Sequence, residues 1–356
     1  MKPASLLPAV PALMMAALVV AACAGGSVPE ARAAGIDAAQ TPAADTPEMD
    51  ALINYLRSHG TTGFIVVQNG ELLINRTWRP PAGDAMFANF VYGVSANGYL
   101  LEDVASQQKS FIAVLAAIAV DRGLLDVERS VTSYLGAGWS QATPDQEAEI
   151  RVIDVLTMSS GLDEQFRYSA APGATFFYNT PVYAVSKRIL TAASGQTLEA
   201  ITTEWLTTPV GMSDTAWRRR PAALASVGND TGLVTTPLDV ARFGLMIMDG
   251  GVNHAGERVV SREQLQAMFA PSQANPSYGR LWWLNSGAYS VRAAGARRDG
   301  PLVPAAPTDM VGAYGAFDRR LYIVPSRNLV IVRTGAATNE HDFDQRFWLL
   351  LNDALG

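Results

Sequence analysis

The sequence predicts a protein of the α/β class, in which a central antiparallel sheet is flanked by helices and carries an inserted all-α subdomain. Residues 63–78 and 319–335 contain β-rich runs near the two ends of the domain, whereas residues 145–270 show mostly helical patterns broken by turns. Residues 343–355, "FDQRFWLLLNDAL", have the apolar spacing of a closing amphipathic helix. Strands at both ends that enclose a helical middle indicate one sheet built from halves distant in sequence.

The N-terminus has the pattern of an export signal. Lys2 is followed by an apolar run and by small residues that end at Cys23. The segment "VAAC" resembles the bacterial lipobox, in which the cysteine is lipidated after cleavage. We therefore predict a lipoprotein signal peptide at residues 1–22 and a lipid on Cys23, the only cysteine of the chain. Ala24 is not the aspartate of an inner-membrane retention signal, which favours an outer-membrane lipoprotein facing the periplasm.

A second interpretation of the N-terminus stays open, because cleavage after the small residues at 31–33 would give a soluble secreted or periplasmic protein. Residues 23–45 are rich in Ala, Gly and Pro and show no apolar period, which predicts a flexible tether. The folded domain is then predicted to occupy residues 46–356, a length that is ample for a buried core.

Two local signals open this domain. Thr46-Pro47-Glu48 combines a capping hydroxyl, a proline in the first turn and an acid near the helix N-terminus, so a helix is expected to begin here. Asn69-Gly70 separates two β-rich runs and is the strongest short signal for a hairpin. The domain is thus expected to start with a helix and an antiparallel hairpin.

The stretch "SQQK", from Ser106 to Lys109, is the main candidate for chemistry. A predicted helix from Ser106 to Arg122 places both side chains on one face. The chain has 27 basic residues, yet lysine occurs only at positions 2, 109 and 187. A buried lysine amine can take the proton of a serine hydroxyl once its pKa is lowered, whereas an arginine stays charged. General base catalysis is therefore a role that arginine cannot fill at position 109.

The alternative is purely structural: Ser106 caps the helix and Lys109 lies in solvent. The residues after Lys109 form an almost continuous apolar face, which predicts a central, buried helix and makes an exposed lysine less expected. The backbone N–H of Ser106 at the helix start would also point towards an oxyanion formed on an attacked carbonyl.

Six segments follow one another in an order that is more specific than any single motif. They are "VASQQKSFIAVLAAIAVDRGLLDVERSVTSYL", "VIDVLTMSSGL", "PGATFFYNTPVYAVSKRILTAASGQTL", "TPVGMSDTAW", "GLVTTPLDVARFGLMIMDGG" and "RRLYIVPSRNLVIVRTG". Together, over about residues 50 to 354, they resemble the serine β-lactamase and penicillin-binding-protein-like superfamily, within it the class C-like branch of esterases and 6-aminohexanoate-dimer hydrolases. The resemblance implies a β-lactamase-like fold and a cofactor-free serine hydrolase.

The resemblance also implies roles for single residues. Ser106 becomes the acylated nucleophile and Lys109 its base. Tyr178 in "FFYNT" matches the tyrosine that relays a proton to the leaving group, and a phenol near basic groups can have a lowered pKa; the alternative for Tyr178 is aromatic packing. Many relatives have Tyr-x-Asn here, so substrate contacts by Asn179 and Thr180 are expected with the asparagine shifted by one position.

The third motif of the superfamily is the largest departure. Counting back from "LYIVP" puts Met310-Val311-Gly312 where the superfamily has Lys-Thr-Gly or His-x-Gly on the strand beside the site. The backbone at Gly312 or the nearby Gly315 is expected to approach the substrate. Because Met310 and Val311 supply neither a cation nor a hydroxyl, small neutral esters are expected to be better substrates than penicillins or D-Ala-D-Ala peptides.

The expected function is hydrolysis of small ester, amide or peptide substrates through a Ser106 acyl-enzyme. A β-lactamase or D-Ala-D-Ala carboxypeptidase, or a non-catalytic sensor or binding protein on the same fold, are the alternatives. A net charge of −6 without a basic cluster argues against nucleic acid as a partner.

Other motifs carry weaker signals. The three histidines lie in neither a GxSxG elbow nor an HExxH helix, which disfavours an α/β-hydrolase or a zinc peptidase. "NEHDFD" at residues 339–344 resembles a carboxylate-rich metal cluster but is better explained as the acidic start of the last helix, so no metal is expected. Of Trp282 and Trp283, at most one flanks the cleft, because successive strand residues point to opposite faces.

Overall fold

The computed structural model describes residues 46–225 and 229–356, which belong to the second of the two units into which the chain divides, Ala31–Gly356. The predicted signal peptide lies outside the described residues. So do the predicted lipid on Cys23 and the predicted tether. Within the described ranges, no helix has both the length and the apolar character needed to cross a bilayer.

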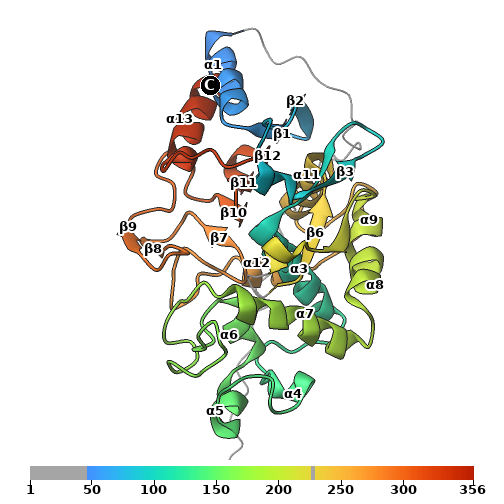
Figure 1. Cartoon of the computed structure of the whole chain (residues 1–356), viewed down its shortest axis with the longest axis vertical. Coiled ribbons are helices and arrows are strands. Elements are labelled where there is room, and N and C mark those ends of the chain that lie inside the picture. The colour runs from blue at the N-terminus through green and yellow to red at the C-terminus, as the bar shows by residue number, and fades with distance from the viewer. Residues whose placement is uncertain (1–45, 226–228) are drawn as a thin grey trace, which may run out of the picture. The chain divides into compact units, whose positions relative to one another are not determined.

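A six-stranded antiparallel sheet, in the order β2-β1-β12-β11-β10-β7, forms the centre of the domain (Figure 1). Its strands are β1 (Thr61–Gln68), β2 (Glu71–Thr77), β7 (Trp283–Leu284), β10 (Val311–Gly315), β11 (Arg319–Val324) and β12 (Leu329–Gly335). β1 pairs with β12 in a register that sets Ile65 opposite Val332. Strands from the two ends of the chain thus lie side by side, which confirms the predicted sheet of sequence-distant halves.

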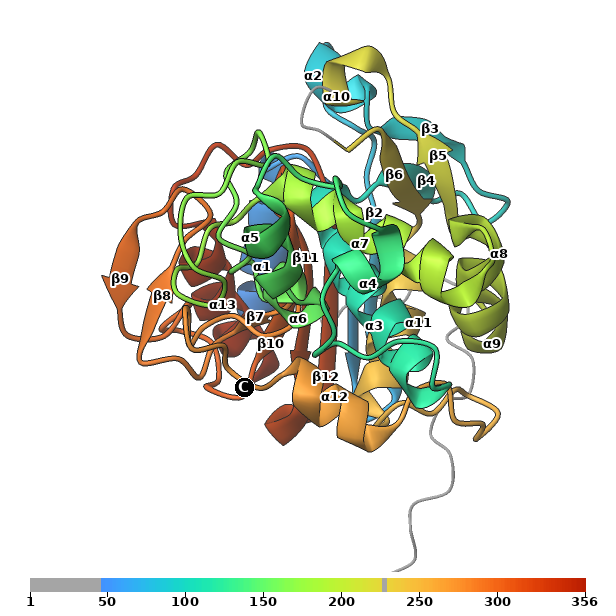
Figure 2. The same cartoon turned by 90° about the horizontal axis from the view of Figure 1, so that it is seen from below.

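Helices cover both faces of this sheet (Figure 2). On one face α1 (Pro47–Ser58) packs beside α13 (Phe343–Leu355), and the ring of Phe64 on β1 meets that of Phe347 edge-on at 5.9 Å between centroids. On the other face lies α11 (Pro237–Met248), which approaches closely at Gly244: a Cβ there would lie 2.6 Å from a methyl carbon of Val330. The predicted closing helix is confirmed.

The two local signals at the start of the domain are also confirmed. Thr46 caps α1 by accepting a hydrogen bond of 3.2 Å from the backbone N–H of Met49, and Pro47 is the first helical residue. Between β1 and β2, Asn69 and Gly70 both have positive φ, 54° and 81°, as a tight hairpin turn requires.

The domain also contains a second sheet, which the sequence did not predict. Its order is β3-β4-β6-β5, formed by β3 (Val91–Val94), β4 (Leu100–Asp103), β5 (Ala216–Arg219) and β6 (Thr231–Thr235). A separate hairpin consists of β8 (Tyr289–Val291) and β9 (Arg297–Asp299). One strand of the second sheet, β4, ends at Asp103, three residues before Ser106.

The predicted buried helix is α3 (Gln108–Asp121), whose residues from Gln108 to Ala119 are all buried. A 3₁₀ turn, η1 (Ala105–Gln107), precedes α3, so Ser106 sits in that turn and not in the α-helix predicted to begin with it. The remaining helices, many of them in the predicted helical middle, are α2 (Ala85–Ala88), α4 (Thr132–Leu135), α5 (Pro144–Glu149), α6 (Val152–Leu156), α7 (Thr180–Ser194), α8 (Leu198–Thr202), α9 (Thr208–Val210), α10 (Ala222–Ala225) and α12 (Arg262–Met268).

Candidate active site

Ser106 is held by a strained turn that a buried ion pair supports. Ala105 has φ +50°, an unfavourable conformation for a residue with a Cβ atom. The carboxylate of Asp103 accepts a hydrogen bond of 2.8 Å from the backbone N–H of Ala105. The same carboxylate binds Nε and Nη2 of Arg220 at 2.7 and 3.0 Å. The pair therefore fixes the turn that presents the serine.

Lys109 lies where a base for Ser106 must lie. Its Nζ donates to Oγ of Ser106 at 2.9 Å and to Oγ1 of Thr180 at 3.2 Å. Burial lowers the pKa of Lys109 well below its usual value, and the positive charges of Arg220 and Lys187 lower it further. An amine in this setting can be neutral and can accept the serine proton.

Tyr178 completes the group around Ser106. Tyr178 and Ser106 line the same cavity, and Lys109 Nζ lies 4.8 Å from the centre of the Tyr178 ring. Burial raises the pKa of Tyr178 to about 12, against the opposing effects of the Ser106 hydrogen bond and of Arg320. The expected lowering of this pKa is therefore wrong. The phenol stays protonated near neutral pH, which suits a proton donor.

Asn179 and Thr180 occupy the start of α7. The side chain of Asn179 caps this helix by accepting from the backbone N–H of Val182 at 3.1 Å, and its amide donates to the carbonyl of Leu162 at 3.0 Å. Thr180 contacts Lys109, as described above. Neither residue lines the cavity beside Ser106, so their predicted contacts with substrate stay predictions.

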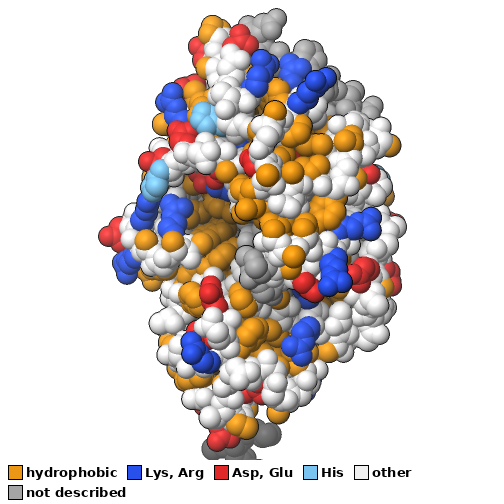
Figure 3. All heavy atoms as spheres, viewed as in Figure 1, with side chains coloured by type: hydrophobic (Ala, Val, Ile, Leu, Met, Phe, Trp, Pro, Cys, Tyr) orange, Lys and Arg blue, Asp and Glu red, His pale blue; other side chains and the backbone are white. Residues whose placement is uncertain are grey.

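A cavity of about 430 Å³ lies beside Ser106. It is lined by Ser106, Tyr178, Trp283, Arg292, Ala293, Ala294, Leu302, Tyr314, Gly315, Ala316, Arg320 and Asp344. Figure 3 shows a hollow with hydrophobic walls on this face, with basic side chains on one side of it. Trp283 stacks on Tyr178 with 5.8 Å between centroids, whereas Trp282 is fully buried against Phe243. Only one of the two tryptophans thus lines this cavity, as predicted.

The placement of the third motif has to be corrected. The strand residues that reach the cavity are Tyr314 and Gly315, followed by Ala316. A Cβ at Gly315 would lie 2.3 Å from the carbonyl oxygen of Val104, so the glycine permits β10 to approach the turn that holds Ser106. Met310-Val311-Gly312 stands earlier in the chain: Gly312 pairs with Trp283 and Tyr322 and does not line the cavity.

This error arose from counting residues back from β11 without knowing the turn before it. Ala316 to Asp318 form that turn, in which Phe317 and Asp318 both have positive φ. The corrected triplet beside Ser106, Ala313-Tyr314-Gly315, still contains neither lysine nor histidine. The predicted approach of backbone at Gly315 agrees with this geometry.

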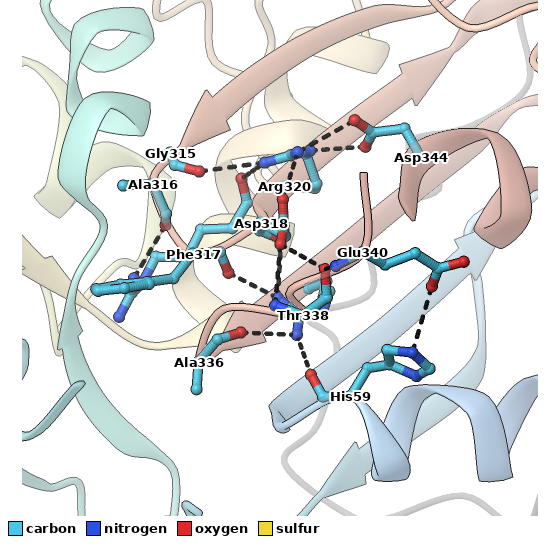
Figure 4. Close-up of polar contacts among 12 residues, drawn as sticks. His59, Gly315, Ala316, Phe317, Asp318, Arg320, Ala336, Thr338, Glu340 and Asp344 are labelled. Atoms are coloured by element: carbon cyan, nitrogen blue, oxygen red, sulfur yellow. Dashed lines mark hydrogen bonds and ion pairs between the residues drawn. The ribbon is translucent and has the colours of Figure 1, made fainter. Parts of the chain in front are cut away.

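Arg320 also reaches the cavity, but its charge is paired (Figure 4). Its Nε and Nη2 bind the carboxylate of Asp344 at 2.7 and 3.1 Å, and Nη2 also binds Asp318 at 3.0 Å. Its Nη1 donates to the carbonyl of Gly315 at 3.1 Å. Arg320 therefore holds the end of β10 in place, between two carboxylates.

Comparison with known proteins identifies the family. A family model described as Beta-lactamase matches residues 50–354. The chain belongs to the Beta-lactamase family. No curated protein sequence is significantly similar to it.

Solved structures place this Beta-lactamase family member within a β-lactamase-like fold. A putative β-lactamase from Bacteroides dorei is 18% identical with a TM-score of 0.65, covering 87% of this chain and 98% of that chain. A putative 6-aminohexanoate-dimer hydrolase from Bacillus anthracis is 16% identical with a TM-score of 0.63, covering 85% and 80%. A class C β-lactamase in complex with cefoxitin is 19% identical with a TM-score of 0.61, covering 86% and 97%. The predicted family and fold class are confirmed.

The predictions from sequence did not include several residues that shape the site of this family member. Asp103 and Arg220 support the turn of Ser106, although 117 positions separate them. The acidic pair Glu102-Asp103, directly before the serine motif, was the one available signal. Its first member binds the fully buried Arg319, with Nη2 3.1 Å from Oε2. Two buried acids between apolar residues need buried cations as partners, so the sequence could have indicated that such cations exist, although not which residues they are.

The acidic segment at residues 339–344 makes structural contacts at the start of α13. Asp342 stands at the N-cap position of α13, and Asp344 in its first turn binds Arg320. Among the described residues, no group of three or more His, Cys, Asp or Glu side chains is arranged to hold a metal ion. His59 instead lies 3.3 Å from the carboxylate of Glu340 (Figure 4).

Proposed function

We propose that this protein is a serine hydrolase that cleaves small esters or amides through an acyl-enzyme on Ser106. The observation that carries the proposal is the buried contact of 2.9 Å between Lys109 Nζ and Ser106 Oγ. Lys109 has no carboxylate partner among the described residues and is buried against a serine and two aromatic rings, so charging it is costly and it is poised to accept a proton.

In the acylation step, the Lys109 amine accepts the hydroxyl proton while Oγ of Ser106 attacks the carbonyl carbon of the substrate. The negative charge passes to the carbonyl oxygen. The backbone N–H of Ser106 and a second N–H at the end of β10, next to Gly315, are the donors proposed for this oxyanion.

Collapse of this intermediate breaks the bond to the leaving group, which takes a proton from the Tyr178 phenol. The Lys109 ammonium then gives its proton to the Tyr178 phenolate, whose ring centre lies 4.8 Å from Nζ, so both side chains return to their starting protonation states. A water molecule then attacks the acyl-enzyme with the same groups acting in reverse.

Two alternatives compete with this proposal. Solved structures similar in fold include a class C β-lactamase and a protein described as β-lactamase/D-alanine carboxypeptidase. A sensor on the same fold would acylate without turnover. The test is release of nitrophenol from 4-nitrophenyl butyrate, with a chromogenic cephalosporin compared on the same preparation. Many equivalents of product per protein support a hydrolase, whereas one equivalent or fewer would identify a sensor.

We further propose that the protein is an envelope lipoprotein attached through Cys23. The lipobox-like "VAAC" at Val20 to Cys23 supports this proposal. Cys23→Ser should release the protein from the membrane fraction or leave its signal uncleaved, with Cys23→Ala as a second variant. A mature wild-type protein that is soluble and begins after residue 30 would contradict it.

A further inference from the structure

Arg292 stands out among the residues that line the cavity beside Ser106 because no carboxylate of the described residues forms an ion pair with it. It lies just after β8, and it donates through Nη2 to the backbone carbonyl of Leu302. Its Nε is buried without a hydrogen-bond partner among the described residues. A buried N–H left without a partner is uncommon and points to a missing acceptor.

Arg292 also lines a second cavity of about 550 Å³, which adjoins the first. The two cavities share Arg292, Ala294, Leu302 and Asp344. Arg298 and His341 line the outer cavity, where Nη2 of Arg298 lies 3.4 Å from Nε2 of His341. Figure 3 shows basic side chains and a histidine gathered on this side of the hollow.

The carboxylates near Arg292 are already occupied. Asp344 binds Arg320 through both oxygens and also accepts from the Tyr322 hydroxyl. Asp342, on the outer cavity, lies 3.0 Å from Nδ1 of His341. Burial lowers the pKa of Arg292, and the positive charges of Arg298 and Arg320 lower it further, whereas Asp344 raises it. The boundary between the cavities is therefore short of negative charge.

We propose that Arg292 is a specificity-determining residue that binds a carboxylate of the substrate, at a distance from the bond that Ser106 attacks. This inference rests on the proposed hydrolase function and names its substrate class: esters or amides that carry a free carboxylate. A guanidinium binds a carboxylate through two parallel N–H donors, which favours arginine at such a position. The inference about Arg292 replaces the earlier expectation that small neutral esters are the better substrates. That expectation assumed that the site has no unpaired cation.

Two matched pairs of aryl esters test the inference. The first compares the mono-4-nitrophenyl ester of glutaric acid with 4-nitrophenyl pentanoate, which has a methyl group in place of the carboxylate. The second places the acid on the leaving group, comparing 4-(butyryloxy)benzoate with its methyl ester. In at least one pair, we expect kcat/KM to be about 10- to 100-fold higher for the acid, the range of a charged hydrogen bond.

Variants then assign the preference to Arg292. Arg292→Gln should bring the acid-to-neutral ratio of kcat/KM close to one, and Arg292→Lys should restore part of it. Arg297→Gln is the matched control on the same hairpin, since Arg297 is exposed and pairs with Asp299, and it should keep the wild-type ratio. A wild-type ratio of one or less in both pairs, with turnover of the neutral esters, overturns the inference while the proposed function stands.

A binding measurement separates this inference from catalysis. The Ser106→Ala variant is titrated by calorimetry with the glutarate monoester and with the pentanoate ester. Tighter binding of the acid, lost in the Ser106→Ala/Arg292→Gln double variant, supports the inference even if wild-type protein cleaves no ester. Equal binding of the two esters, or binding of the acid that persists in the double variant, overturns it.

Discussion

Lys109 Nζ lies 2.9 Å from Ser106 Oγ, and only 2% of the surface of the lysine is exposed. No described carboxylate forms an ion pair with this amine, while Arg220 and Lys187 oppose its charge. The rings of Tyr178 and Tyr183 lie 4.8 and 4.7 Å from Nζ. This relationship suits the lysine to the proposed role of proton acceptor, and most of the predictions below follow from that role.

Replacement of Lys109 by arginine keeps a cation but removes the group that can accept a proton. We expect Lys109→Arg to lower kcat/KM for 4-nitrophenyl butyrate by about 10²- to 10⁴-fold, the usual effect of losing a general base. Arg188→Lys, an exposed change on α7, serves as the control. A Lys109→Arg variant with nearly wild-type kcat/KM would mean that the lysine is only a structural cation.

The pH profile should follow the lowered pKa of Lys109. Hydrolysis requires the neutral amine, so kcat/KM should rise as pH rises through this pKa and level off well below pH 10.5, the ordinary value for lysine. The folded state also binds fewer protons than the unfolded state between the two values. The free energy of unfolding should therefore rise with pH across this window. A kcat/KM that still climbs steeply near pH 10 would contradict this account.

Tyr178 should matter more for substrates whose leaving groups need a proton. Tyr178→Phe removes the donor and keeps the ring stacked on Trp283. We expect kcat to fall by about 10²- to 10⁴-fold for an alkyl ester or an amide. The loss should be smaller for a 4-nitrophenyl ester, because nitrophenolate leaves without a proton. Equal losses on both substrates would argue that Tyr178 only packs against the site.

The buried ion pair of Asp103 and Arg220, which supports the turn of Ser106, should contribute more to the free energy of unfolding than an exposed ion pair does. Asp103→Asn leaves the buried Arg220 without its counter-charge, which should lower the free energy of unfolding by about 3 to 5 kcal/mol. Asp299→Asn breaks the exposed pair with Arg297 and should cost about 0 to 1 kcal/mol. Urea unfolding of the two variants gives the comparison, and similar losses in both would show that Asp103 does not hold the turn.

Local signals in the sequence predicted the elements that depend on local physics. The hairpin at Asn69-Gly70, the cap at Thr46 and the closing helix each rest on residues within one turn of each other, and the structure contains all three. Ser106 and Lys109 are also close in sequence, so their contact could be inferred from helical spacing.

Long-range pairings could not be predicted in this way. The second sheet consists of strands of four or five residues, too short for a clear alternating pattern, which pair β4 with β6 across the helical middle. Tyr314 and Gly315 reach the cavity because the turn after β10 sets the register, which residue counting misjudged. Arg292 follows the first strand of a hairpin of three-residue strands, so nothing local indicated that it would line the same cavity as Ser106.

Labelling of Ser106 tests the central claim most directly. A fluorophosphonate probe reacts with a serine only when a neighbouring base activates it, and peptide mass spectrometry locates the modified residue. The account predicts one labelled residue, Ser106, with labelling and ester turnover both abolished in a folded Ser106→Ala variant. In Ser110→Ala, which removes a buried hydroxyl of α3 that donates to the Leu281 carbonyl, Ser106 should still be labelled. Labelling that persists in Ser106→Ala, or turnover without Ser106, would contradict the account.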